Sequence, residues 1–151
     1  MDLRRLRFGD WVMAIGGVAV LGVMFLDWFE RGGASASAWE AFAVNDVILA
    51  AAALMALTAF VLAVVHPTAA VPLALSSLAT IVSLVALVLV ALRLVWPPGL
   101  GGPEVLETGR ATGAWLGLVA TALLAGGCLA SIRDERLPRP KRPVEPRLVE
   151  P

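Results

Sequence analysis

The chain has 151 residues, 59% of them hydrophobic, and its acidic and basic side chains balance to a formal net charge of zero. A soluble domain is usually only about 45–50% apolar, and the mean hydropathy here is +0.84. This composition excludes an ordinary soluble domain, and we expect no nucleic-acid partner.

Uncharged residues are concentrated in four runs, at 11–26, 47–65, 67–92 and 111–132. A bilayer core of about 30 Å needs roughly 17–25 helical residues, which the last three runs supply. The first run is shorter, but Trp28 and Phe29 follow it and can lie in the headgroup layer. The sequence therefore predicts an all-α membrane protein, an antiparallel bundle of four transmembrane helices at about 11–28, 46–65, 72–95 and 111–132.

Basic residues flank this predicted transmembrane domain, 11–132, unevenly. The N-terminal arm (1–10) and the tail (133–151) hold nine of them, whereas only Arg31, Arg93 and Arg110 lie elsewhere. By the positive-inside rule, both termini are expected in the cytoplasm of a multi-pass plasma-membrane protein. The tail contains five prolines with mixed charge, so it is predicted to be disordered.

The stretch SAWEAFAVNDVILAAAAL, residues 37–54, begins polar and ends apolar. Ser37 and Glu40 have the spacing of a capping box, and Trp39 follows the predicted helix start. Asn45 and Asp46 can cap the next helix. These features predict a short interfacial helical turn on the outer face, with the acidic side chains in water.

The LDWF sequence followed by SAWEAFAVNDVILAAAAL resembles uncharacterised small four-span membrane proteins of high-GC Gram-positive bacteria. The resemblance covers about residues 26–57 and differs at Asp27, where a proline often precedes the tryptophan. It implies the four-span architecture and no activity.

No catalytic, cofactor-binding or metal-binding motif is recognised in the sequence. Cys128 is the single cysteine and His66 the single histidine, so paired-cysteine oxidoreductase and haem-bundle chemistry are not expected. A small multidrug exporter needs a carboxylate within the membrane, whereas the acids here fall near predicted helix ends or in loops. We therefore expect no enzyme and no cofactor.

The acidic residues between the predicted spans allow two interpretations: a solvated, partly paired surface, or a specific cation site. A carboxylate set suits a hard divalent cation, but the spacing matches no ligand loop. Arg93 is expected near the outer interface, where Asp27 or Asp46 could pair with it. The candidate outer-face interaction residues are Asp27, Trp28, Trp39, Glu40, Asp46 and Arg93.

Small residues recur every fourth position in the last predicted span. Such a stripe allows close backbone approach between helices. It can pack within one chain or form an interface between chains, and the sequence leaves both open. The stripe consists of Gly109, Gly113, Gly117, Thr121 and Ala125.

These observations favour a non-enzymatic accessory or structural membrane protein, which acts by helix packing with itself or with a membrane partner. The alternative is a small transporter or channel subunit that functions as an oligomer. The lipid bilayer and a possible homo-oligomer are the expected partners.

Overall fold

A computed structural model describes residues 6–31, 33–41, 44–65, 70–97 and 109–136. The helices are α1 (Phe8–Val23), α2 (Ala38–Ala41), α3 (Asn45–Val65), α4 (Ala70–Val95) and α5 (Thr112–Arg136). Three short strands are also present, β1 (Asp27–Arg31), β2 (Ala34–Ser37) and β3 (Gly109–Arg110).

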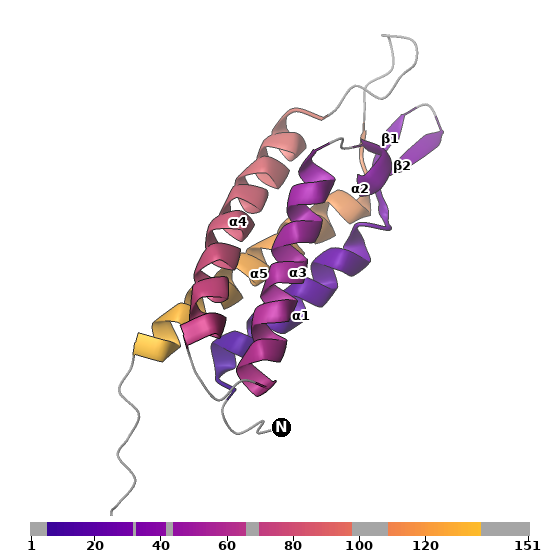
Figure 1. The fold of residues 1–151 in the computed structure, drawn as a ribbon. Coiled ribbons are helices and arrows are strands. Elements are labelled where there is room, and N and C mark those ends of the chain that lie inside the picture. Colours follow the sequence, from indigo (N-terminus) through magenta and orange to yellow (C-terminus); the bar gives the residue numbers. More distant parts are fainter. Residues whose placement is uncertain (1–5, 32, 42–43, 66–69, 98–108, 137–151) are drawn as a thin grey trace, which may run out of the picture.

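The four long helices form a bundle in which successive helices run in opposite directions (Figure 1). α1 and α4 each pack against both α3 and α5, and the most extensive contact is between α1 and α5. α3, α4 and α5 contain apolar stretches of 21, 22 and 22 residues, long enough to cross a membrane, whereas α1 has 16 residues. The described part of the chain is thus mostly helical, with three helices able to span a bilayer.

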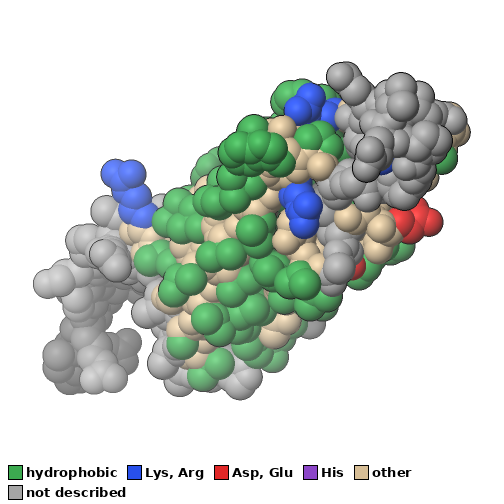
Figure 2. All heavy atoms as spheres, turned by 90° about the horizontal axis from the view of Figure 1, so that it is seen from above, with side chains coloured by type: hydrophobic (Ala, Val, Ile, Leu, Met, Phe, Trp, Pro, Cys, Tyr) green, Lys and Arg blue, Asp and Glu red, His purple; other side chains and the backbone are tan. Residues whose placement is uncertain are grey.

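Small side chains fill the inside of the bundle, and large aliphatic ones cover its outside. Ala52, Ala53 and Ala56 of α3 are fully buried, while Ile81 and Val88 of α4 are more than half exposed. Figure 2 shows the resulting hydrophobic surface along the bundle, with charged side chains gathered toward its ends. Burying alanine and exposing branched residues is the reverse of a soluble core and is typical of helices that pack in lipid.

One end of the bundle carries a three-stranded sheet of order β2-β1-β3, which the all-α expectation missed. β1 is central and antiparallel to both neighbours, so Glu30 pairs with Ser35 on one side and with Gly109 on the other. Gly33, in the β1–β2 connection, has a φ of +84°, a conformation that glycine adopts without a side-chain clash.

The sheet also shortens the first predicted span, which was expected to reach residue 28. α1 ends at Val23, and the Phe25 and Leu26 amides close its last turn by bonding to the Gly22 and Val23 carbonyls. From Asp27 onward the backbone pairs within the sheet. The chain therefore leaves helical geometry because strand pairing satisfies its backbone groups.

The other predicted boundaries shift by smaller amounts. α3 begins at Asn45, α4 includes Pro72 in its first turn, and α5 continues to Arg136. Residues 42–43, 98–108 and 137–151, which include most of the predicted tail, lie outside the described residues. Below, the end with the sheet is called the sheet end, and the end with Arg7 and Arg133 is called the terminal end.

Candidate functional site

Trp28 closes the sheet end of the bundle from β1. Trp28 and its neighbour Phe29 are both 0% exposed and are among the largest fully buried side chains. The Trp28 indole Nε1 donates a hydrogen bond of 2.7 Å to the carbonyl of Val23, at the end of α1. The Val23 carbonyl also accepts the Leu26 amide, so the indole adds a second hydrogen bond at the point where α1 ends.

Trp28 was expected to place its ring in the headgroup layer, but the structure buries this side chain within the protein. Trp39, Trp96 and Trp115 are 42%, 69% and 55% exposed, as an interfacial residue would be. The physical reason for the difference is Gly117. A Cβ atom there would lie 2.2 Å from the Trp28 ring, so only glycine leaves room for the indole.

From Gly113 onward the small-residue stripe is buried inside the chain, and its first two glycines there receive β1. A Cβ atom on Gly113 would meet the Asp27 carbonyl. Thr121 and Ala125 are 0% and 2% exposed, and the Thr121 hydroxyl donates to the Gly117 carbonyl. Gly109, predicted as the first member of the stripe, lies instead in β3, because the chain pairs with β1 before α5 begins.

Arg110 links the sheet to α4. Its guanidinium donates to the carbonyls of Leu94 and Val95 at the C-terminal end of α4. A cation at this position satisfies unpaired carbonyls and complements the helix dipole. Arg110 thus serves in the structure to cap the end of α4.

Three helix ends therefore meet at one cluster. Trp28 holds the end of α1 and lies on α5, the Ala111 amide donates to the Trp28 carbonyl over 2.9 Å, and Arg110 holds the end of α4. We call Trp28, Arg110, Ala111 and Gly117 the clasp. Sequence reasoning singled out Trp28 and Gly117 separately, but nothing in their spacing indicates that they touch.

α2 and Glu40 lie beside the clasp on the exposed surface. The Glu40 carboxylate accepts hydrogen bonds from the Ser37 amide at 2.9 Å and the Ser37 hydroxyl at 3.0 Å. These bonds, the backbone bond first, lower the pKa of Glu40 from its usual value. Trp39 of α2 packs against Phe25 with ring centroids 6.2 Å apart. The predicted N-terminal cap of this helical turn is thus present.

The other candidate outer-face residues do not assemble into a cation site. Asp27 is exposed, whereas Asp46, expected in water, is only 7% exposed and accepts a hydrogen bond from the Val47 amide. Arg93 is half-buried and has partners of its own. Within the part of the chain that is described, no three His, Cys, Asp or Glu side chains are placed to hold a metal ion.

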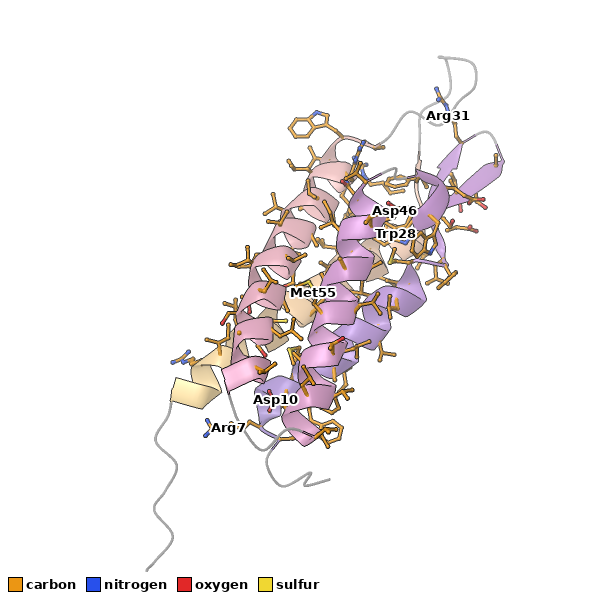
Figure 3. All side chains as sticks on the ribbon, viewed as in Figure 1. Arg7, Asp10, Trp28, Arg31, Asp46 and Met55 are labelled. Atoms are coloured by element: carbon orange, nitrogen blue, oxygen red, sulfur yellow. The ribbon has the colours of Figure 1, made fainter. Side chains whose placement is uncertain are left out.

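A second polar contact, which sequence reasoning missed, joins α1 and α5 at the terminal end. Asp10 accepts a hydrogen bond from the Ser131 hydroxyl at 2.6 Å through one carboxylate oxygen and from the Arg7 amide at 2.9 Å through the other. Figure 3 shows Arg7 and Asp10 at this end, far from Trp28 and Asp46 at the other. The only available signal was Asp10 three residues after Arg7, which is capping-box spacing.

Hydroxyl groups inside the bundle are used locally. Thr80 and Ser83 of α4 donate to carbonyls one turn earlier in the same helix. Among the described residues, no buried side-chain nitrogen or oxygen lacks a hydrogen-bond partner. These groups therefore tie helices internally, and none of them is left unsatisfied for a ligand.

The chain matches no protein-family model, no curated protein and no solved structure.

Proposed function

We propose that the chain is a four-crossing membrane protein with both termini in the cytoplasm, and that it serves as a non-enzymatic accessory or structural component. In this arrangement the sheet end faces outward and offers a small folded surface to a membrane partner. The observation that carries the proposal is the clasp, which joins three helix ends beneath an exposed sheet.

The packing of α1 on α5 supports α1 as a fourth crossing. A Cβ atom on Gly9 would touch the backbone of Ser131, and one on Gly16 would touch that of Leu124. Seven residues further along each helix, Val23 of α1 comes level with Gly117 of α5, and Trp28 contacts both residues. The two helices therefore run antiparallel along the whole length of α1.

The length of α1 fits a crossing only with the help of Trp28. Sixteen residues reach about 24 Å, and Val23 lies level with Gly117, five positions inside the start of α5 at Thr112. Irregular backbone at membrane depth is tolerated where its polar groups are satisfied within the protein. The Phe25 and Leu26 amides bond to the Gly22 and Val23 carbonyls, and the Trp28 indole adds a bond to the Val23 carbonyl, so residues 24–27 can complete the crossing.

The same cluster favours a structural role over transport. A channel or transporter needs a polar path, but the sheet end is filled by Trp28 and Phe29, and the buried Thr80, Ser83 and Thr121 hydroxyls are bonded within their own helices. The small-residue stripe is buried within the chain, so a partner is expected at the sheet surface or on the lipid-facing helices.

Site-specific photo-crosslinking in native membranes tests the proposal. A photoreactive residue at Glu30 or Ser35, both exposed on the sheet, should crosslink a defined protein, whereas the same residue at Val85, 47% exposed on α4, should crosslink mainly lipid. The transporter alternative would instead be supported by two results together: no protein is crosslinked at either sheet position, and proteoliposomes that contain only this chain show substrate flux.

A further inference from the structure

β2 is an edge strand of the sheet, and its outer side pairs with no strand in the part of the chain that is described. Arg31 pairs with Ala34, so two residues connect β1 to β2. A turn of this length closes with hydrogen bonds between its flanking residues, and bonded and non-bonded pairs alternate along antiparallel strands. The amide and the carbonyl of Ser35 are therefore directed away from β1.

The next outward-directed amide of β2 is already used. Ser37 donates its amide to the Glu40 carboxylate at 2.9 Å, and α2 begins at the following residue. Ser35 is exposed, and outside the sheet no described residue makes a backbone hydrogen bond to it. β2 thus presents a donor and an acceptor at Ser35 to a strand that is added along its edge.

The side chains of β2 leave this edge open. The strand consists of alanine and serine only, without the lysine or proline that commonly discourages pairing at a sheet edge. Ala34 and Ser35 are both exposed. Figure 1 shows the β1–β2 hairpin projecting from the end of the bundle. We call the outer side of Ala34–Ser37 the β2 edge.

The strand behind β2 supplies a negative charge. Glu30 of β1 lies directly opposite Ser35, so the two side chains share one face of the sheet. Glu30 is exposed and makes no side-chain hydrogen bond or ion pair with any residue that is described. An added strand would lie about 10 Å from β1, within the combined reach of a lysine and a glutamate side chain across the small Ser35.

We propose that the β2 edge binds an extended, basic segment of a membrane partner, which adds to the sheet as a fourth strand beside Ser35. Main-chain hydrogen bonds give such binding its affinity, and a basic side chain near Glu30 gives it specificity. The open edge is short, so it suits a partner held in the same membrane, where the effective concentration is high. This inference rests on the proposed accessory role.

A strand-forming peptide of alternating lysine and threonine, the amide of KTKTKTKT, serves as the probe. It is titrated into the isotope-labelled full-length chain in zwitterionic micelles, and the amide signals are followed by NMR. Strand addition should shift the Ser35 amide signal and slow its exchange with solvent, which charge attraction alone would not do. The acidic peptide ETETETET should bind more weakly, because Glu30 repels it.

Two substitutions at one position separate the backbone from the side chain. Ser35→Pro removes the outward amide and leaves the bonds to β1, since proline is tolerated on the outer side of edge strands. It should weaken peptide binding about fivefold relative to Ser35→Ala, which keeps the amide. Glu30→Gln should weaken binding about threefold. Asp134→Asn, an equal charge change at the terminal end, should leave the affinity unchanged.

Four results would overturn the site: a Ser35 amide signal that stays unchanged up to the solubility limit of the peptide, equal affinities of Ser35→Pro and Ser35→Ala, equal losses with Glu30→Gln and Asp134→Asn, or a Ser35 shift that follows the concentration of the chain alone, which would indicate a second copy at the β2 edge.

Peptide binding in micelles does not depend on the proposed function, because it requires neither an orientation in the membrane nor a native partner. Peptide binding without any protein crosslinked at Glu30 or Ser35 would therefore reject the accessory role and keep strand addition at the β2 edge. Crosslinking of a protein there without peptide binding would reject strand addition and keep the accessory role.

Discussion

Gly117→Ala tests directly how the sheet end is built, since the added methyl group would lie 2.2 Å from two atoms of the Trp28 ring. Gly126→Ala is the matched control, because it lies on the same helix and a Cβ atom there would meet nothing within 4 Å. Alanine is the better helix former by about 1 kcal/mol at either position, so this gain cancels when the two variants are compared.

The remaining difference comes from the clash. Overpacking costs about 1–3 kcal/mol, and a displaced indole also loses its hydrogen bond to Val23, worth about 1 kcal/mol. Gly117→Ala should therefore be about 2–4 kcal/mol less stable than Gly126→Ala. Equilibrium unfolding in mixed detergent micelles, followed by far-UV circular dichroism, measures this difference.

Trp28→Phe turns the comparison into a double-mutant cycle. Phenylalanine lacks the Cη2 and Cζ2 atoms that the new methyl group would strike, so the penalty of Gly117→Ala should fall by at least half in that background. Coupling of about 0.5–3 kcal/mol is typical of residues in contact. Equal stability of the two alanine variants, or the same penalty with and without Trp28, would refute the packing described for the clasp.

Three further predictions follow from the topology and the sheet end. In a cysteine-free background, a single cysteine at position 35 should react with an impermeant thiol reagent from outside intact cells. A single cysteine at position 68 should react only after permeabilisation, and the reverse pattern would invert the orientation. Arg110→Gln should lower the free energy of unfolding by about 1 kcal/mol, because the end of α4 loses its cap, and an unchanged midpoint in detergent would contradict this. The hydrogen bonds from Ser37 lower the pKa of Glu40, so Glu40 stabilises the fold at neutral pH, and this stabilisation is lost as the pH falls through the folded-state pKa. Glu40→Gln should therefore remove the acid-dependent change in the unfolding midpoint, and an identical pH profile would count against this role.

The sequence by itself determined the helices. Long uncharged runs predicted α3, α4 and α5 closely, because a segment that must bury its backbone in lipid has few alternatives to a helix. The cap at the start of α2 was also predictable, because Ser37 and Glu40 are three residues apart and need no distant partner to form it.

Only the tertiary structure decided what the clasp residues do. Trp28 reads as a belt aromatic and Gly117 as a helix-packing glycine, but the two lie far apart in the sequence and their contact depends on how α1 packs on α5. The sheet was missed for the same reason: β1 pairs with β3 across most of the chain, and two residues of strand leave no periodic signal. Asp10 likewise bonds to Ser131 at the other end of the sequence. Contacts of this kind arise from the packing of helices already formed, and no local pattern encodes them.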